Sequence, residues 1–200
     1  MAGDQLPLFM IGHSFGGHAL GLIPNHEKVE ALYTFGSASG WHGWMSRLES
    51  LRVQFLWNVV MPPVTCAMGY LPMSWFGMGE DLPLGVYRQW RHWCRFPHYF
   101  FDDPKVAGRM CEAFSRVKTQ IVAANALDDA WASPRARDAL FQGYSNAEVL
   151  RVDIDPRPVG GIGHMGYFRA NAEPLWADAL TWFESKIEKT GVSGGEGIQS

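Results

Sequence analysis

A serine flanked by glycines stands early in the sequence, in a pattern that suits nucleophilic catalysis. The segment GHSFGG (residues 12–17) follows one apolar run and precedes another, which places Ser14 on a tight turn between a strand and a helix. Such a turn strains the serine backbone, and we expect side chains two residues to either side of Ser14 to collide. The turn would direct the backbone N–H of Phe15 at the space beside the Ser14 hydroxyl, where a developing oxyanion is stabilised. A glycine-rich turn that merely ends a strand is the alternative interpretation.

Two later segments offer the groups that activate a serine. A serine hydroxyl is a weak nucleophile until a base takes its proton, and the base needs a carboxylate to hold its tautomer and to stabilise the imidazolium. Asp128 and Asp129 follow an apolar run, and an acidic residue at the carboxyl end of a strand lies on the functional edge of a sheet. His164 follows the next such run, in a loop of small residues that leaves it free to reach across. The order serine, aspartate, histidine therefore predicts a catalytic triad.

Alternating strands and helices are expected to position these residues. Apolar segments predict strands at 6–11, 29–35, 120–124 and 148–154. Helical patterns lie at 18–23, 135–144 and 173–189. This alternation is typical of the α/β class, in which helical crossovers connect the strands of a parallel sheet. The last strand alternates polar and apolar residues, which predicts a place nearer the edge of the sheet.

Residues 41–110 interrupt this alternation and are too many for a loop. They contain six of the nine tryptophans and many of the methionines, which predicts a helical insertion between the second and third strands. Its aromatic and methionine side chains form its own core, line an apolar pocket for an acyl group, or do both. The expected organisation is therefore a core at 1–40 and 111–189, a helical cap at 41–110 and a disordered tail at 190–200.

The other polar candidates favour structural roles. His13 lies inside the turn and is expected to pack or to hydrogen-bond locally. His92 and His98 lie among aromatic residues, which predicts packing or surface positions. Glu80 and Asp81 precede a helical pattern and are expected to cap that helix.

The composition excludes several classes of function. Apolar residues make up 47% of the chain and charged residues 18%, with a net charge of −3, as in an ordinary globular protein. No basic run exists that could follow a phosphate backbone, so nucleic acid is not an expected partner. The three cysteines have no zinc-ligand spacing and predict reduced thiols in a cytoplasmic protein. Prolines interrupt the most apolar stretch, residues 53–78, which makes it a poor membrane span, and no signal peptide is visible.

The chain resembles the α/β-hydrolase superfamily, in particular an uncharacterised bacterial branch related to serine aminopeptidase/lipase-like hydrolases. The matching stretches are IGHSFGG (residues 11–17), GEDLPLGV (79–86) and IGHMGYF (162–168). The resemblance covers residues 6–183 and implies the α/β-hydrolase fold, from the nucleophile strand onward, with a helical cap insertion. In this superfamily the acid usually sits three residues after the small residue that ends its strand, here Ala126. That spacing favours a triad of Ser14, Asp129 and His164, with Asp128 as the alternative acid.

The resemblance also implies that the strands preceding the nucleophile strand are absent from this chain. The second oxyanion donor normally comes from a loop in that part of the fold. Without those strands, the strand at 6–11 becomes an exposed apolar edge through which the chain could associate with itself. A truncated gene product, a fragment or a domain completed by another chain would explain this arrangement.

These features predict a serine hydrolase that acts on small-molecule carboxylic esters or amides with an apolar acyl part. Phe15 would supply one oxyanion donor, and no metal or cofactor is implied. Two alternatives remain: a catalytically weak fragment or binding module of the same fold, and an acyltransferase that uses the same triad.

Overall fold

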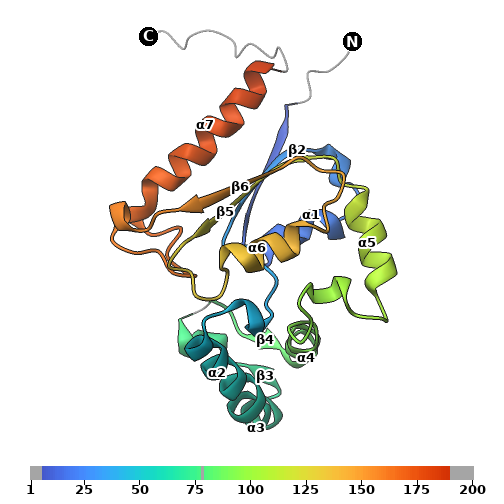
Figure 1. The fold of residues 1–200 in the computed structure, drawn as a ribbon, viewed down its shortest axis with the longest axis vertical. Coiled ribbons are helices and arrows are strands. Elements are labelled where there is room, and N and C mark those ends of the chain that lie inside the picture. The colour runs from blue at the N-terminus through green and yellow to red at the C-terminus, as the bar shows by residue number, and fades with distance from the viewer. Residues whose placement is uncertain (1–5, 78, 190–200) are drawn as a thin grey trace.

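A computed structural model of the protein describes residues 6–77 and 79–189. Four parallel strands form its central sheet in the order β1-β2-β5-β6 (Figure 1). They are β1 (Leu8–His13), β2 (Val29–Phe35), β5 (Gln120–Ala126) and β6 (Val149–Ile154). In the described sheet β6 forms one edge, as its alternating pattern predicts. β1 forms the other edge, where Leu8 and Ile11 are about half exposed.

Helices cover both faces of this sheet (Figure 1). One face carries α1 (Gly16–Leu22), α5 (Ala107–Ser115) and α6 (Pro134–Phe141), and the other carries α7 (Glu173–Lys189). Successive side chains of β5 serve the two faces in turn. Ile121 and Ala123 join the cluster under α1, α5 and α6, whereas Val122 and Ala124 join the cluster under α7. Both faces of the sheet are therefore buried, as expected for parallel strands.

The part of the segment between β2 and β5 that precedes α5, residues 42–93, lies beyond the carboxyl ends of the strands (Figure 1). It contains α2 (Arg47–Phe55), α3 (Met61–Met68) and α4 (Leu84–Trp93), with a π-helical turn at Leu56–Val60. A short antiparallel pair, β3 (Tyr70–Leu71) and β4 (Leu82–Pro83), joins the last two helices. Met61, Leu71, Met73 and Tyr87 form a separate buried cluster here. The domain boundaries at 41 and 110 stay a prediction, and the tail expected at 190–200 lies outside the described residues.

Most elements begin and end near the predicted residues, and β1 and β5 extend further than predicted for one shared reason. β2 and α7 match the predicted ranges. β1 was expected to stop at residue 11, but Gly12 and His13 continue its pairing with β2. β5 was expected to stop at residue 124, but Asn125 and Ala126 pair with β6. Pairing with a neighbouring strand, which local sequence does not reveal, sets these ends.

Helix boundaries depend on their first turns. α1 begins at Gly16, two residues before the predicted start, because the chain passes directly from the turn into the helix. α6 begins at Pro134, where the Ser133 hydroxyl accepts a hydrogen bond from the Ala136 N–H. Every helix in the described ranges is too short or too polar to cross a membrane.

Candidate active site

Ser14 occupies the tight turn between β1 and α1. Its φ of +52° lies in the left-handed region, which costs a non-glycine residue about 1–3 kcal/mol and marks functional turns. The Ser14 N–H donates to the Phe35 carbonyl at 3.0 Å, which fixes the turn to the end of β2. The hydroxyl is thereby held at the carboxyl edge of the sheet, as the sequence predicts.

The glycines around Ser14 differ in what they make possible. A Cβ on Gly12 would lie 2.7 Å from the Gly16 carbonyl carbon, so the expected collision is present on that side. A Cβ on Gly16 would meet nothing within 4 Å, so the same expectation is wrong on the other side. The second close approach is at Gly17, where a Cβ would lie 2.4 Å from the Ser37 side chain. The packing of α1 against the loop after β2 creates this constraint.

The three residues of the predicted triad lie within hydrogen-bond distance of one another. His164 Nε2 is 3.1 Å from Ser14 Oγ, and His164 Nδ1 is 3.0 Å from Asp129 Oδ2. Ser14 follows β1, Asp129 follows β5 and His164 lies in the loop after β6. Because the strands are parallel, their carboxyl ends meet at one edge and bring together residues 150 positions apart. Asp128 points elsewhere and accepts hydrogen bonds from two backbone N–H groups of the histidine loop, those of Ile162 and Gly163.

The Asp129 carboxylate is buried and bound on both oxygens. Oδ1 accepts from the N–H groups of Trp131 and Ala132 at 3.0 and 2.9 Å, while Oδ2 faces His164. Burial by itself would raise the pKa of Asp129. The hydrogen bond and charge of His164 and the two N–H groups outweigh burial, so the pKa lies below its ordinary value. The carboxylate therefore stays ionised beside the histidine at neutral pH.

Tyr167 contacts the predicted triad at Asp129, and the sequence prediction missed it. It is fully buried, and its hydroxyl donates to Asp129 Oδ2 at 3.0 Å while accepting from the Ala126 N–H at 2.9 Å. Burial and the Asp129 charge raise the pKa of this tyrosine far above its usual range, so it remains a donor. Its position three residues after His164 was the available signal, because the loop that brings His164 to Asp129 also carries Tyr167 there.

His13 contacts the loop after β6 that carries His164. Its Nε2 donates to the backbone carbonyl of His164 at 2.8 Å, and its ring packs against those of His164, Tyr167 and Phe168. Burial lowers the pKa of His13, which keeps the ring neutral at physiological pH. The expected structural role fits these contacts, but the hydrogen bond is long-range and not local.

A cavity of about 410 Å³ opens beside Ser14 and His164. Its lining is mostly apolar and comes from both the sheet edge and the insertion. The insertion contributes Met45, Val53, Trp57, Met73, Glu80, Leu82, Val86, Gln89, Trp90, Trp93, Cys94 and Tyr99. Some of the aromatic and methionine side chains form the cluster around Tyr87 and others line the cavity, while an acyl group as the occupant stays a prediction.

His18 also lines this cavity and was not among the predicted site residues. It is buried in the first turns of α1, and its Nε2 donates to the Ala38 carbonyl at 3.1 Å. Burial lowers its pKa to about 4, so the ring is neutral. The Phe15 ring stacks on it with centroids 5.2 Å apart.

The remaining polar candidates take other places. His92 bonds to Asp103 and His98 to Asp102, which fits the packing and surface roles expected for these histidines. The expectation that Glu80 and Asp81 cap α4 is wrong, because α4 has Pro83 at its N-cap and no side-chain cap. Asp81 instead accepts from the N–H and hydroxyl of Ser74, and Glu80 reaches the cavity.

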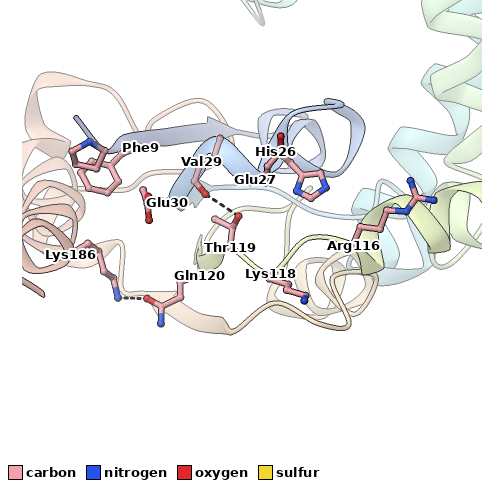
Figure 2. A pocket seen from close by; sticks show the side chains of 11 residues that line it. Phe9, His26, Glu27, Val29, Glu30, Arg116, Lys118, Thr119, Gln120 and Lys186 are labelled. Carbon is pink, nitrogen blue, oxygen red and sulfur yellow. Dashed lines mark hydrogen bonds between the residues drawn. The ribbon is translucent and has the colours of Figure 1, made fainter. Parts of the chain in front are cut away.

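A second cavity, of about 480 Å³, lies at the opposite end of the sheet (Figure 2). Its lining mixes both signs of charge, including Glu27, Glu30, Arg116 and Lys118. The hydroxyl of Thr119 donates to the Val29 carbonyl there, so it is engaged in holding two strands together. The chemistry therefore points to the cavity beside Ser14 and not to this charged one.

Comparisons with known proteins bear on the fold. No family model matches the chain, and no curated protein matches its sequence. Among solved structures, it is similar to DcsB in complex with its substrate analogue, with a TM-score of 0.52, 15% identity, and 92% of this chain and 66% of that chain covered. It is similar to a structure described under the metagenome-derived lipolytic enzymes LipS and LipT, with a TM-score of 0.51, 17% identity, and 89% and 65% covered. Mouse alpha/beta hydrolase domain-containing protein 10 matches with a TM-score of 0.45, 15% identity, and 92% and 65% covered.

The chain thus spans about two thirds of the length of these solved chains. At such low identity the similarity concerns the fold alone. The α/β-hydrolase fold expected from the motifs is confirmed.

Proposed function

We propose that this chain, which has the α/β-hydrolase fold, is a serine hydrolase of carboxylic esters or amides with an apolar acyl part. Ser14 attacks the carbonyl carbon, His164 accepts the Ser14 proton and later gives it to the leaving group, and Asp129 holds His164. One observation carries the proposal. Ser14, His164 and Asp129 form a continuous hydrogen-bonded chain, with links of 3.1 and 3.0 Å, at the base of a mostly apolar cavity.

The geometry supports a definite protonation sequence. With Nδ1–H donating to Asp129, His164 Nε2 is bare and can accept the Ser14 proton as the Oγ–C bond forms. The imidazolium that results faces a carboxylate whose lowered pKa keeps it charged. That charge stabilises the imidazolium without itself taking the proton.

The Phe15 backbone N–H supports the charge that develops on the substrate oxygen. Phe15 is the N-cap of α1, where the N–H groups are not used by the helix itself. In the described part of the chain, no backbone hydrogen bond uses this N–H. One such donor contributes about 10²–10³ in rate where it has been removed in other serine enzymes.

The cavity supports the choice of acyl part. Tryptophan, methionine and aliphatic side chains line it. Transfer of an alkyl group from water into such a pocket is favourable.

A fluorophosphonate probe tests the proposal directly, because it modifies only an activated serine. We expect the protein to be labelled and to hydrolyse short-chain 4-nitrophenyl esters, and both signals to vanish in Ser14→Ala. His164→Ala should abolish turnover while the fold is retained, as checked by circular dichroism. Labelling that persists in Ser14→Ala would move the nucleophile elsewhere and overturn the assignment.

A further inference from the structure

The insertion contributes to the cavity lining two exposed polar residues that the proposed hydrolysis does not use. They belong to residues 79–94, the stretch that begins with GEDLPLGV. Its contributions to the lining are Glu80, Leu82, Val86, Gln89, Trp90, Trp93 and Cys94. In a mostly apolar pocket, a few polar groups fix the orientation and identity of the ligand. Glu80 and Gln89 are such groups.

Glu80 gives the margin of the cavity an exposed negative charge. It is the one carboxylate among the described lining residues, and none of those residues is a lysine or an arginine. Glu80 takes part in no ion pair in the described part of the chain. Its neighbour Asp81 differs, since its carboxylate is occupied by two hydrogen bonds from Ser74. A carboxylate at the margin of an apolar pocket attracts a cation on the ligand.

The aromatic lining favours the same kind of ligand. Trp57, Trp90, Trp93 and Trp131 all border the cavity. Trp57 is fixed between Tyr87, on which it stacks at 5.5 Å, and Trp90, which it meets edge-to-face at 4.8 Å. Indole faces attract organic cations, most strongly where water is excluded. Several tryptophans with one carboxylate therefore suit an ammonium group better than a plain alkyl end.

We propose that the acyl chain of the substrate ends in an ammonium group, which Glu80 binds together with the tryptophans. The Gln89 side-chain oxygen offers a further acceptor to a protonated amine. The aliphatic part of the acyl chain then lies along the apolar lining between Ser14 and Glu80. This inference rests on the proposed hydrolysis at Ser14 and names the substrate class for it.

Two esters of equal shape test the inference. One 4-nitrophenyl ester carries a terminal trimethylammonium group, and the other carries a tert-butyl group in its place. We expect kcat/KM to be roughly 10-fold higher for the cationic ester at low salt, through KM, and the preference to shrink as salt is added. Glu80→Gln should remove most of the preference, whereas Asp81→Asn, the same charge change one residue away, should leave it within about twofold.

Three outcomes would overturn the inference: equal kcat/KM for the two esters, an undiminished preference in Glu80→Gln, or the same loss in Asp81→Asn. Turnover of the neutral ester and its loss in Ser14→Ala report on the hydrolysis alone, so the two proposals fail separately. Should neither ester be cleaved, the N-methylamides of the two acids are titrated into Ser14→Ala by tryptophan fluorescence. Tighter binding of the cationic amide that Glu80→Gln abolishes would support the site, and equal binding would refute it.

Discussion

At the scale of single residues, the two adjacent aspartates have different surroundings. Asp129 faces His164 and is held by two backbone N–H groups. Asp128 instead accepts from the N–H groups of Ile162 and Gly163, and so supports the loop that carries His164. Asp129 therefore supplies the carboxylate of the proposed triad, whereas Asp128 holds the conformation of the loop that contains His164.

Asparagine substitutions at these two positions should have unequal effects. Asp129→Asn is expected to lower kcat steeply, by up to ~10⁴, because His164 would be held in the wrong tautomer. Asp128→Asn should cost much less, because it keeps one of the two hydrogen bonds to the loop and leaves the contact between Asp129 and His164 in place. Steady-state ester hydrolysis by both folded variants is the measurement. A larger loss in Asp128→Asn would transfer the acid role to Asp128.

The Tyr167 hydroxyl adjusts the charge beside the histidine. In Tyr167→Phe, Asp129 Oδ2 loses a donor, so its charge acts more fully on His164 and favours the imidazolium. We expect the acid limb of the kcat/KM profile to move to higher pH, by up to about one unit. Stability should fall by about 1–3 kcal/mol, because the buried Ala126 N–H loses its partner.

Tyr144 offers a matched control for this change. It is also buried, and its hydroxyl donates to the Gly17 carbonyl and accepts from the Gly21 N–H, away from Asp129. Tyr144→Phe should lose similar stability and leave the pH profile in place. A shift of the profile in both variants would show that general loosening, and not the carboxylate contact, is responsible.

At the scale of elements, the turn from β1 into α1 is set by close backbone approach. Gly12 packs under the first turn of α1, and Gly17 packs against Ser37. Gly16, although part of the G-x-S-x-G pattern, faces open space. The motif contains Gly12 and Gly16, whereas close packing requires glycine at Gly12 and Gly17.

Alanine at Gly17 and at Gly16 should separate these requirements. Gly17→Ala places a Cβ against Ser37 and should cost about 1–3 kcal/mol of unfolding free energy. Gly16→Ala should be neutral or stabilising by up to about 1 kcal/mol, since alanine favours helix and meets no neighbour there. Urea unfolding of both variants measures the difference. Equal losses would mean that the gap at Gly16 is occupied in solution.

At the scale of the whole molecule, the stability of the fold depends on pH through the buried, uncharged His18. His18 is buried between α1 and the aromatic residues Phe15, Tyr99 and Phe100. In the folded state, protonation of His18 would place a positive charge in this apolar environment. Folding and proton binding at His18 are therefore coupled.

Acid should destabilise the protein through His18 before most carboxylates are protonated. The folded pKa of about 4 is lowered from 6.5, so the unfolded chain binds the proton more readily. The contribution of His18 to the free energy of unfolding is largest well above pH 6.5 and is lost as pH falls from 6.5 through 4, by about 3 kcal/mol in total. The unfolding free energy of His18→Leu should depend less on pH between 7 and 5 than that of the wild type. Urea unfolding at pH 7 and at pH 5 gives this free energy for both proteins. An equal change between the two pH values in wild type and His18→Leu would contradict the coupling.

The sequence alone determined which residues could do chemistry and most of the elements that carry them. Local patterns suffice for this, because a serine on a glycine turn, an acid after one strand and a histidine after the next are each readable within a few residues. The ranges of β2 and α7 were likewise readable from the spacing of their apolar side chains. Self-association through β1 and the absence of preceding strands stay predictions.

Only the tertiary structure decided the contacts between distant segments. Strand pairing extended β1 and β5, the loop after β6 brought Tyr167 onto Asp129, and His13 bonded to a carbonyl 151 residues away. Glu80 borders the cavity, whereas its neighbour Asp81 accepts hydrogen bonds from Ser74. These contacts depend on where the chain returns in space, and the free energy that selects them comes from burial and pairing across the whole fold, which no short stretch of sequence contains.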